Sequence, residues 1–229
     1  MHAISLSVNL RFKIHPDNIF FIRLIKNLKM IIKGFKKLAV ASAIICLAAI
    51  FGFGQKVDFA QVKVPDLNAK DIQPLQNVRS KAVVFLFIET SCPISNRYVP
   101  EIKRLYEKYT SGGVTFWLVY PDKDDSAPAI RRHLKEYGYK ISVLRDLRHE
   151  LVKVTGVNVT PEAVVFIPSD DGVRMIYRGR IDDLVTAFGK SRPAPTNHDL
   201  DETLDAIISG KTMTLKTTTA IGCSISDLN

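Results

Sequence analysis

Runs of apolar residues separated by polar turns predict the strands of a central sheet. Three runs are rich in β-branched and aromatic residues and have the length of a strand buried on both faces, at 82–88, 114–120 and 163–167. After the first run, apolar residues recur every three or four positions at 94–109, as an amphipathic helix requires. After the second run, Ser126 is a suitable N-cap for another helix through Tyr137. We expect Pro100 to kink the first helix, because proline lacks the backbone N–H that a helix interior uses.

A tight turn follows the third run. Ser169-Asp170-Asp171-Gly172 has turn composition, and the chain then returns through a strand at 173–178. Strands that alternate with helices and end in a hairpin indicate an α/β sandwich with a mixed central sheet.

Basic residues are concentrated at the N-terminus. The chain has a formal net charge of +9, but residues 1–54 contain eight Lys or Arg and one acidic residue. The remainder therefore holds 24 basic and 22 acidic residues and is nearly neutral. We accordingly expect no nucleic-acid partner.

An export signal is predicted within residues 1–54. Lysines precede an apolar run at 38–51 that includes Cys46, and small glycines follow it, as in a secretory signal peptide. Met30 directly precedes this pattern and is the expected true start. The alternative is an uncleaved signal anchor or an amphipathic N-terminal helix, and an uncleaved signal segment would be the protein's membrane attachment. Either interpretation places the body outside the cytoplasm, in the periplasm or another extracytoplasmic space.

Cys92 stands between the first predicted strand and the helix after it. Backbone N–H groups at a helix start favour an anion, so this position lowers the pKa of a thiol and makes its thiolate a nucleophile. A buried, inert thiol is the alternative, because free cysteine packs well in a core. We expect Cys92 to be a nucleophile.

The order of these features resembles the thioredoxin-like superfamily, specifically the redoxin group of AhpC/TSA-type and TlpA/ResA-type proteins. Cys92 follows the central strand, Pro100 lies eight residues later, and Val159-Thr160-Pro161 precedes the strand-turn-strand 163–181. The resemblance implies a thioredoxin-like three-layer α/β/α sandwich over residues 55–210. A Thr-rich tail, 211–229, follows and carries Cys223.

The resemblance also implies roles for residues near Cys92. Pro161 is expected to be cis and to lie against Cys92, where an ordinary trans proline is the alternative. Thr160, Pro161 and Pro93 are the implied substrate-binding residues.

Two departures from the family motifs limit this comparison. Ser95 replaces the second cysteine of a Cys-x-x-Cys motif, and serine cannot resolve a mixed disulfide. Glu89 stands where a peroxiredoxin motif has threonine, and Phe85 where it has proline. Cys223 would be the other cysteine of the exported chain, so we predict that it resolves Cys92, with a static disulfide or a free thiol as alternatives.

Glu162 and Glu89 are candidates for proton transfer, although each is more often a solvated or capping carboxylate. We expect no metal site. His133, His149 and His198 lack metal-ligand spacing, and Asn96 replaces the second cysteine of a Sco-type copper motif. We expect no cofactor either, because thiol chemistry needs none.

The favoured hypothesis is an exported thiol-disulfide oxidoreductase in which the Cys92 thiolate attacks and Cys223 resolves. Its partners would be a thiol or disulfide protein, or a peroxide, together with an external reductant. An AhpC/TSA-like antioxidant peroxidase is one alternative. A non-catalytic binding module with a structural disulfide is the other.

Overall fold

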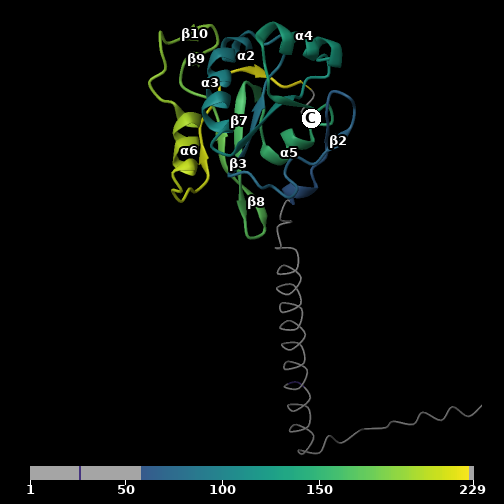
Figure 1. Cartoon of the computed structure of the whole chain (residues 1–229), viewed down its shortest axis with the longest axis vertical. Coiled ribbons are helices and arrows are strands. Elements are labelled where there is room, and N and C mark those ends of the chain that lie inside the picture. The colour runs from purple at the N-terminus through teal and green to yellow at the C-terminus, as the bar shows by residue number, and fades with distance from the viewer. Residues whose placement is uncertain (1–25, 27–57, 227–229) are drawn as a thin grey trace, which may run out of the picture. The chain divides into compact units, whose positions relative to one another are not determined.

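A six-stranded mixed sheet forms the centre of the computed structural model, which describes residue 26 and residues 58–226 (Figure 1). The chain divides into two units, Met1–Lys56 and Val57–Asn229, and the second is described below. The predicted export signal at 38–51 and the predicted start at Met30 lie outside the described residues. Within the described residues, no helix combines the length and the apolar character needed to cross a membrane.

The sheet has the strand order β11-β8-β7-β3-β4-β5. Its strands are β3 (Ala82–Phe87), β4 (Val114–Tyr120), β5 (Ser142–Arg145), β7 (Glu162–Ser169), β8 (Gly172–Gly179) and β11 (Lys216–Thr217). β3 runs parallel to β4 and antiparallel to β7, which forms the predicted hairpin with β8. Every residue of β3 is buried, which confirms that this apolar run forms a strand covered on both faces.

Helices cover both faces of the sheet. They are α2 (Pro93–Arg97), α3 (Val99–Thr110), α4 (Ala127–Tyr137), α5 (Glu150–Thr155) and α6 (Asp199–Ile208). Apolar residues of α3, α4 and α6 pack with Val84 and Leu86 on one face, while those of α5 pack with Phe85 and Phe87 on the other. Alternate residues of β3 therefore feed two cores, and the predicted thioredoxin-like three-layer sandwich is confirmed.

The helix after Cys92 is divided rather than kinked. We predicted one helix with Pro100 in its interior, but α2 ends at Arg97 and α3 begins at Val99, so Pro100 lies in the first turn of α3. A first turn needs no intrahelical N–H bond from its early residues, and proline is therefore tolerated there. The Tyr98 N–H donates to the carbonyl oxygens of Ile94 and Ser95, which closes α2 just before the break.

Short strands complete the unit. Near the N-terminus, the 3-10 turn η1 (Phe59–Gln61) precedes a hairpin of β1 (Val64–Pro65) and β2 (Asp71–Ile72). After β8, a second hairpin joins β9 (Val185–Ala187) and β10 (Lys190–Ser191). In the third pair, β12 (Cys223–Ser224) of the tail lies beside β6 (Val159–Thr160). The predicted tail is thus built into the fold. β11 extends the central sheet beside β8, and β12 pairs with β6.

Candidate active site

Cys92 is the N-cap residue of α2. Its Sγ accepts a hydrogen bond from the Ser95 N–H at 3.4 Å, and Pro93 occupies the first turn. The Cys92 side chain is only 1% exposed. Cys92 thus lies at a helix start, as the sequence predicted, and the stabilisation of a thiolate there stays a prediction.

The Thr160–Pro161 loop lies against Cys92. The peptide bond between these two residues is cis, which confirms the prediction. The Thr160 carbonyl oxygen is 3.2 Å from Cys92 Sγ, and both Thr160 and Pro161 are buried. Pro93, the residue after Cys92, is exposed.

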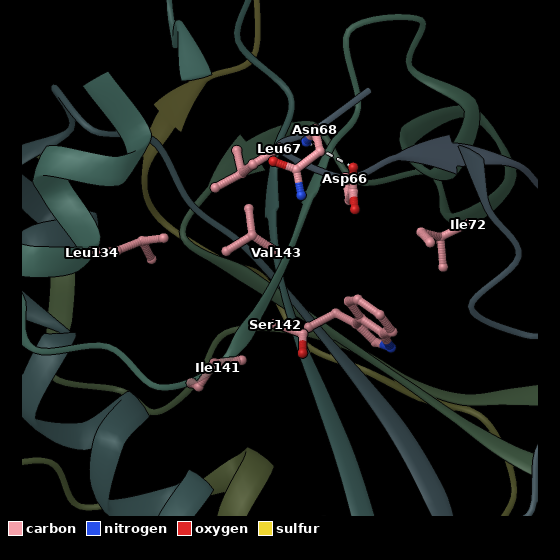
Figure 2. A pocket seen from close by; sticks show the side chains of 9 residues that line it. Asp66, Leu67, Asn68, Ile72, Leu134, Ile141, Ser142 and Val143 are labelled. Carbon is pink, nitrogen blue, oxygen red and sulfur yellow. Dashed lines mark hydrogen bonds between the residues drawn. The ribbon is translucent and has the colours of Figure 1, made fainter. Parts of the chain in front are cut away.

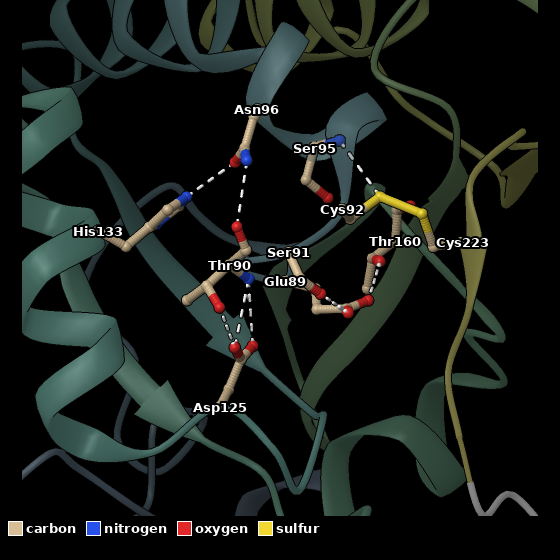
Figure 3. Close-up of a disulfide and its surroundings, with 10 residues drawn as sticks. All are labelled: Glu89, Thr90, Ser91, Cys92, Ser95, Asn96, Asp125, His133, Thr160 and Cys223. Atoms are coloured by element: carbon tan, nitrogen blue, oxygen red, sulfur yellow. Dashed lines mark hydrogen bonds between the residues drawn. A yellow bond between two sulfur atoms is a disulfide. The ribbon is translucent and has the colours of Figure 1, made fainter. Parts of the chain in front are cut away.

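Cys92 is joined to Cys223 by a disulfide bond across 131 residues of sequence (Figure 3). The two Cα atoms are 6.2 Å apart, within the range that a disulfide spans. β12 runs antiparallel to β6 and places Cys223 opposite Thr160. Folding therefore brings together the two cysteines that the sequence could only nominate as a pair.

The residues on either side of Cys223 hold it close to Cys92. A Cβ at Gly222 would lie 2.2 Å from the Thr160 carbonyl oxygen, so only glycine fits there without a shift of backbone. On the other side, Ile225 is buried in the core that contains Phe85 and Phe87, and its N–H donates to the Asn158 carbonyl. Sequence reasoning missed both positions, although a glycine directly before a cysteine was a local signal.

The two candidate proton-transfer residues lie in different surroundings. Glu89 accepts hydrogen bonds from the hydroxyl groups of Ser91 and Thr160, the latter at 3.4 Å, so its carboxylate bridges the segment before Cys92 and the cis-proline loop (Figure 3). Glu162 is buried, which raises its pKa, and its carboxylate faces Arg178 at 3.7 Å. No measurement tests either role, and both stay predictions.

A buried polar network holds the segment before Cys92. The Thr90 N–H and hydroxyl donate to the Asp125 carboxylate, and burial raises the pKa of Asp125 although these hydrogen bonds oppose the shift. Asn96 donates from Nδ2 to the Thr90 carbonyl at 3.1 Å, and its Oδ1 lies 2.8 Å from His133 Nε2. Asn96 thus ties α2 to the adjacent loop and to α4. Spacing along the chain did not reveal this role.

Two other features among the described residues include none of the predicted site residues. An open hollow of about 390 Å³ lies between the β1–β2 hairpin, α4 and β5 (Figure 2). Glu101, Asp182 and His198 have potential metal-ligating atoms within 4.8 Å of one another, but Asp182 already accepts hydrogen bonds from the Tyr98 hydroxyl and the Leu184 N–H. The expectation that the protein binds no metal stays a prediction.

The fold is that of the thioredoxin-like class, and the site holds a paired cysteine at a helix start. A sequence model of the AhpC/TSA family matches residues 56–175, more than half of the chain, and the protein belongs to that family.

Curated relatives are thiol-disulfide oxidoreductases. ResA of Bacillus thuringiensis subsp. konkukian is 31% identical over 109 residues, which make up 48% of this chain and 60% of that protein. ResA of Halalkalibacterium halodurans is 22% identical over 134 residues, or 58% of this chain and 73% of that protein. The match therefore spans less than two thirds of the first relative.

Two solved structures share the fold. A hypothetical protein of Sinorhizobium meliloti 1021 has a TM-score of 0.60 at 23% identity and covers 71% of this chain and 88% of its own. An uncharacterized conserved protein of Geobacillus kaustophilus has a TM-score of 0.58 at 27% identity and covers 71% of this chain and 86% of its own. Both structural alignments cover a larger share of the chain than the AhpC/TSA sequence model, which matches residues 56–175.

Proposed function

We propose that the protein is an extracytoplasmic thiol-disulfide oxidoreductase that cycles between a Cys92–Cys223 disulfide and the dithiol. One observation carries the proposal: the sulfur at the start of α2 is bonded to a cysteine on a strand paired with the cis-proline loop. The names of the curated relatives support this reaction class. The export pattern in the sequence and the disulfide itself support the location.

In the proposed reaction, the Cys92 thiolate attacks one sulfur of a substrate disulfide. A mixed disulfide forms, and the other substrate sulfur leaves as a thiolate. The Cys223 thiolate then attacks the Cys92 sulfur, so the internal disulfide forms and the second substrate thiolate departs. The substrate gains two electrons and the cysteine pair loses two. Glu89, hydrogen-bonded to Thr160 beside Cys92, is the residue that we assign to proton transfer.

An external dithiol would restore the reduced pair. Cys92 is 1% exposed, whereas Cys223 is half-buried and is followed by the exposed Ser224. We therefore assign Cys223 as the sulfur that the external thiolate attacks, with Cys92 as the leaving thiolate. The thiolate-stabilising position of Cys92 suits a leaving group, because a thiol of low pKa leaves faster.

Membership of the AhpC/TSA family keeps a peroxidase as the second candidate. There the Cys92 thiolate would attack a peroxide oxygen and release an alcohol or water, and the resulting sulfenic acid would condense with the Cys223 thiol to give the same disulfide and water. Glu89 occupies the peroxiredoxin threonine position, which favours the disulfide reaction over the peroxide one.

The decisive experiment measures turnover of a protein disulfide and of a peroxide with a dithiol reductant in excess. We expect Cys92→Ser to abolish both reactions, because it removes the nucleophile. Cys223→Ser, reacted with the protein disulfide in the absence of the dithiol, should stop after one mixed disulfide, which mass spectrometry would detect on Cys92. Cys46→Ser is the matched control and should turn over like the wild type.

The outcomes separate the candidates. Reduction of the protein disulfide without peroxide consumption supports the oxidoreductase, and the reverse supports the peroxidase. Full activity of Cys92→Ser would refute both the oxidoreductase and the peroxidase, because neither could then use Cys92 as its nucleophile. A wild-type disulfide that turns over neither substrate would identify a binding module with a structural bond.

A further inference from the structure

The tail of the protein occupies the strand edge beside the disulfide. β12 is antiparallel to β6, with Cys223 opposite Thr160 and Ser224 opposite Val159, and the Ile225 N–H donates to the Asn158 carbonyl at 3.0 Å. An extended peptide that pairs with the edge of β6 would need these same backbone groups. The docked tail and such a peptide therefore exclude each other.

Contacts independent of the disulfide hold the tail in place. Ile225 is 5% exposed and packs in the core beneath the sheet. The Ser226 hydroxyl donates to the Asp122 carboxylate at 3.0 Å. Upstream, the Thr218 N–H donates to the Arg178 carbonyl, and a Cβ at Gly179 would collide with Thr218. Anchors thus lie on both sides of Cys223 and do not depend on its sulfur.

We propose that the tail strand is a tethered competitor for the β6 edge, and that Ile225 is a specificity-determining residue that keeps it docked after the disulfide is reduced. This inference rests on the proposed function. Extended, cysteine-bearing protein segments then reach Cys92 only when the whole strand withdraws.

Small disulfides face a smaller barrier. A substrate without backbone amides gains nothing from the β6 edge, and it needs only the Cys223 side chain to move away from Cys92. A peptide that pairs with β6 needs Ile225 to leave its buried site as well. Loosening the Ile225 anchor should therefore accelerate exchange with peptides far more than exchange with small disulfides.

The test uses the full chain with Cys46→Ser and Cys223→Ser, so that Cys92 is the only thiol. One probe is hydroxyethyl disulfide. The other is a mixed disulfide of hydroxyethyl thiol with a synthetic peptide that copies residues 219–226, a segment known to fit the edge. In each reaction the Cys92 thiolate takes one half of the probe and releases the other half as a thiolate, whose appearance gives the rate.

We expect Ile225→Ala to raise the peptide rate on the order of tenfold, because the substitution removes most of a buried anchor. The hydroxyethyl disulfide rate should change less than about twofold, since that probe does not compete for the edge. Ile225→Val should fall between wild type and Ile225→Ala. Leu215→Ala, at a tail residue that is 52% exposed, is the matched control and should leave both rates unchanged.

If Ile225→Ala accelerates both reactions equally, the proposal is overturned, because greater mobility of the whole site would then explain the effect. Unchanged rates for both probes in Ile225→Ala would overturn it too, since the tail would then already have left the β6 edge before the substitution. Hydrogen exchange at the Ile225 amide provides a test that needs no chemistry at Cys92: protection retained in Cys223→Ser supports docking, and protection lost refutes it. If neither probe reacts while this amide stays protected, the proposed function fails and the docked tail remains.

Discussion

Loss of the Cys92–Cys223 bond should lower the free energy of unfolding by about 2–5 kcal/mol. The bond closes a loop across a sequence separation of 131 residues. For a loop of that length, the loss of chain entropy in the unfolded state corresponds to about 5 kcal/mol at room temperature. This is an upper value, because a real unfolded chain keeps some structure that the cross-link does not remove.

Cys223→Ser is the appropriate change for this measurement. Cys223 is half-buried at the surface, whereas Cys92 is fully buried beside Thr160, so a substitution at Cys92 would also disturb packing. The assay is urea denaturation of wild type and variant without reductant, followed by circular dichroism. The wild type should also show a smaller denaturant slope, because a cross-linked unfolded chain exposes less surface.

Two controls test the reasoning. Dithiothreitol should lower the stability of the wild type to near that of Cys223→Ser and should leave the variant unchanged. Cys46→Ser should match the wild type. Equal urea midpoints for oxidised wild type and Cys223→Ser would refute the argument, since the bond would then contribute nothing to the folded state.

Further predictions concern single side chains around the site and the core. Burial raises the pKa of Asp146 to about 6, so its contribution to stability is greatest below pH 4 and is lost as pH rises through 6; Asp146→Asn should remove about 1–3 kcal/mol of the pH dependence of the free energy of unfolding over that window, measured by urea denaturation at each pH. Gly222→Ala should slow formation of the internal disulfide, measured by quenched alkylation, because the new Cβ meets the Thr160 carbonyl; normal kinetics would contradict this contact. Glu89→Gln should slow disulfide exchange by about a hundredfold at unchanged urea midpoint, and an unaltered rate would remove Glu89 from proton transfer.

The central strand and the position of Cys92 followed from local patterns, whereas the cis-proline loop was expected only because of the resemblance to the thioredoxin-like superfamily. Seven consecutive apolar residues from Ala82 define a buried strand whatever surrounds them, and a cysteine directly before a helical repeat must lie near its N-terminus. Pro100 predicted the disturbance of the helix but not its form. A kink within one helix and a break between two helices at Tyr98 have the same sequence signature, and the tertiary packing of the two segments decides between them.

The tail could not be placed from its sequence. β11 and β12 have two residues each, too few for alternation to be visible, and both form by pairing with distant strands. The importance of the two residues that hold β12 in place depends on distant parts of the chain. Gly222 matters because a Cβ there would collide with the Thr160 carbonyl, and Ile225 because it is buried in the core cluster that also contains Phe87.

The stability contributed by the disulfide also constrains the reductant. In a thermodynamic cycle, the free energy by which the bond stabilises the fold equals the free energy by which the fold favours the bond. About 1.4 kcal/mol corresponds to about 30 mV for a two-electron couple, so a contribution of 2 kcal/mol lowers the potential by about 40 mV and one of 5 kcal/mol by about 110 mV relative to the same pair in the unfolded chain. If Cys223→Ser lowers the free energy of unfolding by about 5 kcal/mol, a strongly reducing dithiol is required to regenerate the Cys92 thiolate. If it lowers it by about 2 kcal/mol, a milder dithiol is sufficient. The urea series on Cys223→Ser therefore narrows the class of partner that can complete the proposed cycle.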